Sequence, residues 1–275
     1  MKKSTRILLT VIVAAVLVIT AVSSVFGYIA MTKDFDHQLC YFNAGSVYGS
    51  LYILLPIIAS AISVICGIML RKKVSFIKAP SANIPTVFTS VLTGLLMFAS
   101  AIITSTNSSE LSKISTAAVI FAIVAGIYFV LLPFMGEKPF MAFLSFAPAL
   151  WATFKLLEEY FRQGEPLNSP IKTVSLTMFA FLLLFFAEEI RFGFDRQIPG
   201  TYYFCILSAV AFTGNAVLPK LAIILTGDSI FKFSVIDWCL GAAVLLFLLA
   251  RLSAIPAVLG EYNENKETDA ESEED

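Results

Sequence analysis

The stretch ILLTVIVAAVLVITAVSSVFGYIAM, residues 7–31, contains no charged side chain and decides the class of this protein. A helix rises about 1.5 Å per residue, so about 20 apolar residues cross the roughly 30 Å hydrocarbon core of a bilayer. Seven more apolar stretches follow, at residues 47–70, 84–104, 117–135, 139–157, 171–190, 201–226 and 236–254. The pattern predicts an all-α polytopic membrane helix bundle of about eight transmembrane helices, occupying residues 1–260.

The composition excludes a soluble fold. Hydrophobic residues make up 58% of the chain and charged residues 14%, whereas soluble proteins carry about 25% charged residues. The net charge is −1, but residues 261–275 hold eight acidic side chains and one lysine, so the remainder is basic. This tail has too little apolar surface to fold, and we expect a disordered acidic cytoplasmic segment. A basic remainder suits anionic lipid headgroups of the bilayer and gives no reason to expect nucleic acid.

Lysines and arginines in the short loops predict the orientation. With the N-terminus inside, 12 of them fall on the cytoplasmic side and seven on the outer side. We therefore expect a multi-pass plasma-membrane protein with both termini in the cytoplasm. One alternative concerns the first stretch, because its basic start, apolar core and Ala21-Val-Ser23 also resemble a cleaved secretory signal peptide. Cleavage would leave seven spans and the rest of the topology unchanged.

No metal site or cofactor is predicted. His37 is the only histidine, and it lies in a loop near Asp34, Asp36 and Cys40 without the spacing of a metal-ligand set. The other three cysteines fall within apolar stretches, where cysteine is usually a small packing residue. A disulfide framework is therefore not expected either.

Small residues at four-residue spacing predict where helices pack closely. Lipid does not drive helices together, so association depends on small side chains that let backbones approach. Such rows occur in the second, third and fourth stretches: Ala59, Ser63 and Gly67; Thr86, Ser90 and Gly94; Ala118, Ala122 and Gly126. We expect the first four helices to form a compact bundle of their own.

Polar residues inside apolar stretches gather in the second half. In the fifth stretch, Pro148 lies near mid-span and is expected to kink the helix, while Lys155 and Glu159 follow on the same face. In the seventh, Asn215 lies deep in the span, and Lys220 follows it directly after a proline. These positions predict an outward-facing polar pocket lined by Lys155, Glu159, Asn215 and Lys220. The alternatives are that Lys155 extends to the membrane surface and that Asn215 bonds a neighbouring helix.

Glu188 and Glu189 end the sixth stretch. An acid at the edge of an apolar span is a candidate proton relay, and pairing of Glu188 with Arg191 at the helix end is the alternative. The pair does not match intramembrane CAAX-type proteases, in which arginine follows two glutamates after three residues. Here arginine follows after one residue, and no histidine lies in a span. An enzymatic activity is therefore not favoured.

The best functional hypothesis is small-molecule transport or binding in a polar cavity among the fifth to seventh helices. The alternative is a non-transporting membrane subunit that packs against a partner membrane protein. The expected partners are the lipid bilayer and one of these two, a small-molecule ligand or a protein.

Overall fold

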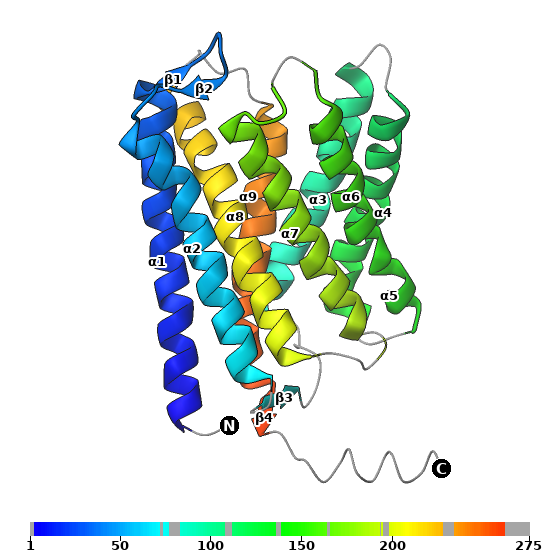
Figure 1. Cartoon of the computed structure of the whole chain (residues 1–275). Helices are drawn as coiled ribbons and strands as arrows, with labels where there is room; N and C mark the ends of the chain where they lie inside the picture. Colours follow the sequence, from blue (N-terminus) through cyan, green and yellow to red (C-terminus); the bar gives the residue numbers. More distant parts are fainter. Residues whose placement is uncertain are drawn as a thin grey trace, which may run out of the picture.

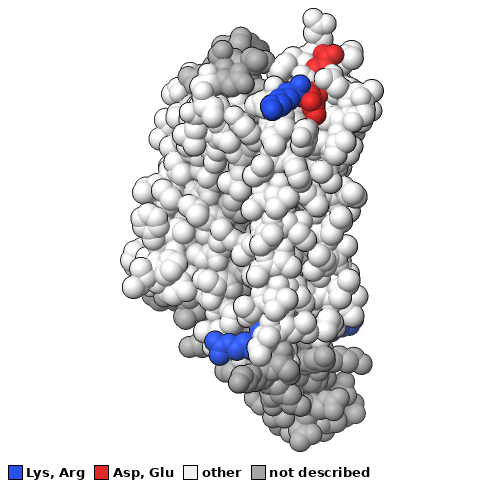
Figure 2. All heavy atoms as spheres, turned by 90° about the vertical axis from the view of Figure 1, so that its left-hand side faces the viewer, with Lys and Arg blue, Asp and Glu red and all other residues white. Residues whose placement is uncertain are grey.

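The computed structural model describes residues 3–71, 74–76, 83–107, 112–135, 139–163, 166–192, 194, 198–227 and 234–261. Eight helical spans in these residues are long and apolar enough to cross a membrane, which confirms the predicted membrane helix bundle. The chain is therefore a multi-pass membrane protein. The lipid-facing belt is evident in Figure 2, where charged side chains gather near the two ends and leave a broad uncharged band between them.

The helices follow the predicted stretches closely. They are α1 (Lys3–Lys33), α2 (Val47–Leu70), α3 (Ile84–Asn107), α4 (Lys113–Met135), α5 (Pro139–Leu144), α6 (Phe146–Phe161), α7 (Pro170–Phe192), α8 (Pro199–Thr226) and α9 (Val235–Ala254).

The fifth span is broken into α5 and α6 at Ser145, whose hydroxyl donates to the carbonyl of Ala142 at 2.7 Å. Pro148 has no N–H to donate, so the helix cannot continue smoothly through this point and α6 starts anew with Pro148 in its first turn. The span also extends further than its apolar stretch, to Phe161. Lys155 and Glu159 are therefore held on a regular helix.

Six helices close into a ring. Neighbours around it are α8 and α9, α9 and α3, α3 and α4, α4 and α6, α6 and α7, and α7 and α8. The remaining two long helices, α1 and α2, pack on each other and on the outside of α8 (Figure 1). Since α8 is shared by both parts, it is the most deeply buried span.

The expectation that the first four helices form their own bundle is wrong. They form two separate pairs, α1 with α2 and α3 with α4, and these pairs pack on opposite sides of the second half. The small-residue rows do mark close approaches, as between Gly94 and Gly126, where an added Cβ on Gly94 would lie 2.8 Å from the carbonyl oxygen of Gly126. The row of α2, however, meets α8 at Gly67 and not another of the first four helices. Residue spacing identifies a packing face of a helix but not the helix that packs on it.

Short strands cover the two ends of the bundle. β1 (Phe35–Asp36) pairs with β2 (Tyr41–Phe42) in the loop between α1 and α2. At the opposite end, β3 (Val74–Phe76) pairs with β4 (Leu259–Glu261), which follows the short 3₁₀ turn η1 (Ile255–Ala257). Glu261 thus still belongs to a paired strand, and the rest of the predicted disordered tail, residues 262–275, lies outside the described residues.

We predict that Gly67→Ala lowers thermal stability. Alanine normally favours a helix over glycine by about 1 kcal/mol, yet here the new Cβ would lie 2.7 Å from the carbonyl oxygen of Gly200. The new Cβ should push α2 away from α8, and this loss of packing should outweigh the gain in helix propensity. We expect the free energy of unfolding to fall by about 1–3 kcal/mol. The unfolding midpoint of the purified protein in detergent measures the effect. Ile68→Ala, on an exposed side of the same helix, serves as the control. A Gly67→Ala midpoint at or above wild type would contradict the close approach.

Candidate functional site

A cavity of about 350 Å³ lies inside the ring, between α6, α7, α8 and α9. It occupies the half of the bundle away from the chain termini, since it is lined by the C-terminal part of α6 and the N-terminal parts of α7 and α9. Its lining includes the exposed residues Arg162 and Ser234, so the cavity opens at that face. Its volume falls at the lower end of the range of small-molecule sites, about 300–1,000 Å³.

The walls are mainly apolar and aromatic. They are formed by Trp151 on α6, Met178, Phe179 and Leu182 on α7, Val217 on α8, and Trp238, Leu240 and Val244 on α9. The protein contains two tryptophans, and both line this cavity. Hydrophobic side chains from four helices therefore surround the cavity below its mouth.

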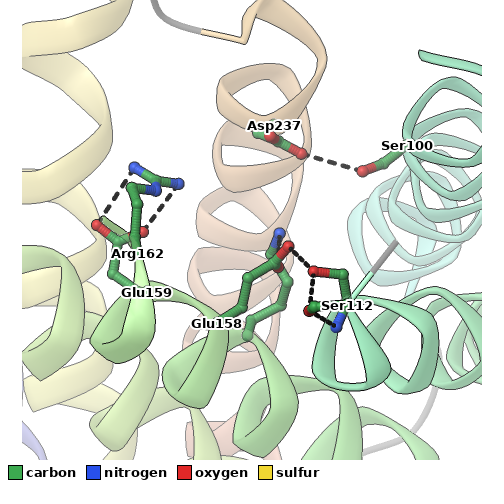
Figure 3. A network of polar contacts seen from close by, with 8 residues as sticks. Ser100, Ser112, Glu158, Glu159, Arg162 and Asp237 are labelled. Carbon is green, nitrogen blue, oxygen red and sulfur yellow. Dashed lines mark hydrogen bonds and ion pairs between the residues drawn. The ribbon is translucent and has the colours of Figure 1, made fainter. Parts of the chain in front are cut away.

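The mouth carries the charges. On α6, Lys155 donates to Glu158 at 2.7 Å. Arg162, the residue directly after α6, pairs with Glu159 at 2.9 Å (Figure 3). Glu158 also accepts from the Ser115 hydroxyl of α4 at 3.0 Å. These contacts hold the α6 side of the mouth in a fixed arrangement.

Across the mouth, Asp237 lies in the first turn of α9 and accepts a hydrogen bond from Ser100 of α3 at 3.1 Å (Figure 3). The partial positive charge at a helix N-terminus favours a carboxylate in this position. Sequence reasoning missed Asp237, which is the second residue of the eighth apolar stretch and resembles an ordinary charge at a helix end.

Two polar groups lie deeper. The Thr213 hydroxyl of α8 borders the cavity, is fully buried and has no hydrogen-bond partner. Lys220 stands behind the wall, where its Nζ donates to the Ser175 hydroxyl at 3.1 Å and lies 4.0 Å from the ring centre of Trp238. A buried hydroxyl without a partner is costly, so Thr213 is an unsatisfied polar group in the lining of the cavity.

The four residues expected to line the pocket are divided by the fold. Lys155 and Glu159 line the cavity, and Lys220 contacts two of its wall residues. Asn215 points the other way, accepting from the Ser23 hydroxyl at 2.6 Å and donating to the carbonyl of Tyr52 at 2.9 Å. Its amide joins α8 to α1 and α2. Thr213, two residues earlier on α8, lies on the side of the helix that lines the cavity.

Side chains fill the half of the ring that lies nearer the chain termini. The buried carboxylate of Glu189 accepts from the Arg251 guanidinium of α9 and from the Tyr202 hydroxyl of α8. On the preceding turn of α9, the ring of Phe247 contacts those of Phe129 on α4 and Phe185 on α7 edge to face. Among the described residues, buried side chains therefore fill this end of the ring.

The second glutamate forms helix-end contacts. Glu188 accepts from Arg191 at 2.8 Å and from the Thr201 hydroxyl at 3.1 Å. The pairing of Glu188 with Arg191 is the alternative that the sequence offered to a proton relay. The sequence offered no signal for the ion pair between Arg251 and Glu189. These residues are far apart in the chain and meet only when the helices close into the ring.

Within the described ranges, no group of three histidine, cysteine, aspartate or glutamate side chains is placed to hold a metal ion. Comparison of the chain with family models, curated proteins and solved structures gave no match. Any statement of function must therefore come from the cavity and its surroundings.

We predict that Arg251→Met destabilises the protein strongly, while the double variant Arg251→Met, Glu189→Met recovers most of the loss. Removing one partner leaves a buried charge without compensation and costs about 3–5 kcal/mol, whereas replacing both by apolar side chains is close to neutral. The unfolding midpoint in detergent measures both. Equal destabilisation by the single and the double variant would show that the ion pair itself, not charge compensation, supports this region.

Proposed function

We propose that this protein binds a small molecule with an apolar body in the cavity between α6, α7, α8 and α9, and transports it across the membrane. The single observation that carries the proposal is the cavity itself, with its aromatic walls, charged mouth and unpartnered Thr213 hydroxyl. Binding sites for small molecules are mostly apolar and contain a few placed polar groups, as here.

Transport is favoured over simple binding because the half of the ring nearer the chain termini is filled by buried side chains. A cavity that opens at one face and is sealed at the other is one of the two states that alternating access requires. To release a ligand on the sealed side, the contact of Glu189 with Arg251 and Tyr202 has to separate. Glu189 is thus our candidate for a proton-linked step, because proton uptake by its carboxylate would weaken the pair, and Glu188 at the adjacent helix end is the second candidate.

We predict that a bulky side chain in the cavity abolishes binding. The probes are phenylpropylamine, phenylpropanol and phenylpropanoate, which share an apolar body and differ in charge. At least one of them should change the tryptophan fluorescence of the purified protein in a saturable manner, because Trp151 and Trp238 both line the cavity. Val244→Phe should raise the apparent Kd of that probe by about tenfold or more by filling the space. Uptake of the same probe into proteoliposomes tests the transport step.

The matched control is Leu246→Phe, which places the same phenylalanine side chain on α9 at a position where the side chain is 46% exposed. It should leave probe binding unchanged. Equal loss in both variants would indicate a general distortion of α9. Absence of any saturable signal in the wild type, together with stoichiometric co-purification of a second membrane protein, would replace the proposal with the non-transporting subunit.

The proposal also includes the orientation, with the cavity mouth facing outward from the plasma membrane. Cys40, in the loop between β1 and β2, lies at the same end as the mouth, and Arg71 lies exposed at the opposite end. We predict that a membrane-impermeant maleimide labels Cys40 on intact cells, and that Cys40→Ser abolishes this signal. A cysteine placed at Arg71 in the Cys40→Ser background should react only after permeabilisation. The reverse pattern would place the mouth in the cytoplasm.

A further inference from the structure

The ionised side chains that line the cavity are not balanced in charge. Lys155 with Glu158 and Arg162 with Glu159 form two ion pairs, so these four side chains cancel. Asp237 is the fifth, and among the residues that the structure describes no lysine or arginine nitrogen lies within 4.0 Å of its carboxylate. Among the described lining residues, Asp237 is therefore the acid whose charge no ion pair offsets.

The contacts of Asp237 support this charge without neutralising it. They consist of one hydrogen bond from Ser100 and the N-terminal end of α9. The side chain is only partly buried, so water completes its solvation while the cavity is open. When an apolar body fills the cavity, that water is displaced and the carboxylate needs a new partner. A neutral or anionic ligand leaves this cost in place, whereas an ammonium group supplies the missing charge.

The aromatic side chains beside Asp237 also favour a cation. Trp151, Trp238 and Phe179 line the same space, and aromatic rings attract cations, tryptophan most strongly. Trp238 already holds the ammonium of Lys220 at 4.0 Å from its ring centre. Because Lys220 repels a second cation on its side of the ring, a ligand ammonium is directed toward Asp237 and the mouth.

We propose that the ligand of this cavity is an organic cation, an amine with an apolar body, and that Asp237 is its counter-ion. This inference rests on the proposed function, since it names the class of molecule bound at the same site. Asp237 would then select the ligand by charge, while the apolar walls supply most of the contact area.

The test compares the three phenylpropyl probes on the full-length protein in nanodiscs of phosphatidylcholine, with tryptophan fluorescence as the readout. Wild type should bind phenylpropylamine about tenfold or more tightly than phenylpropanol, and phenylpropanoate least tightly. Asp237→Asn should bring the amine to the affinity of the alcohol, while the alcohol itself binds as in wild type. Asp237→Glu, which keeps the charge, should retain the preference for the amine.

Asp36→Asn is the charge-matched control. Asp36 lies at the same end of the molecule but outside the cavity, and the backbone N–H groups of Leu39 and Gln38 lower the pKa of its carboxyl, so it is ionised at neutral pH. An asparagine can accept the same two hydrogen bonds. This variant should leave all three affinities unchanged, since it removes an equal charge from the protein but none from the cavity.

The outcomes separate this inference from the proposed function. Equal binding of amine and alcohol by wild type, or an amine preference that persists in Asp237→Asn, overturns the assignment of an organic cation and leaves the binding cavity in place. A saturable response to sodium chloride alone that competes with the amine and disappears in Asp237→Asn also overturns it, in favour of an inorganic cation. No saturable response to any probe overturns both proposals. Where Asp237→Asn does not fold, loss of the amine preference in Asp237→Glu overturns the inference.

Discussion

A charged or amide side chain that this chain carries into the bilayer is stabilised by a partner inside the protein, because hydrocarbon offers none. Glu189 meets Arg251 and Tyr202, and Asn215 meets Ser23 and the backbone of α2. Each of these contacts joins helices that are distant in the sequence. The need to satisfy buried polar groups therefore also determines which helices become neighbours and how the ring is closed.

The long helix α8 connects the two parts of the molecule. One side packs on α1 and α2 through a glycine contact and the Asn215 amide, and the other side forms part of the cavity wall with Thr213 and Val217. A movement of α8 would change both its packing against α1 and α2 and the shape of the cavity. This arrangement gives the first two helices a role in positioning the site, although neither of them contributes to its lining.

Much of the fold could be predicted because a transmembrane span is a local property of the sequence. The apolar length needed to cross a bilayer is read directly from consecutive residues, and all eight spans were found in this way. The direction in which Asn215 and Thr213 point could not be read, since it depends on the rotation of α8 against its neighbours. For the same reason the sequence could not show that Arg251, near the end of the eighth stretch, is buried beside Glu189.

The sequence alone thus determined the class of this protein, the number of its spans and the concentration of polar residues in its second half, because hydrophobic length and composition are properties of single segments. Only the tertiary structure decided which polar residues meet. It combined Lys155 and Glu159 with Asp237, Thr213 and the two tryptophans around one cavity. Such a set forms when helices far apart in the chain close into a ring, and periodicity within one helix carries no information about the helix on the other side.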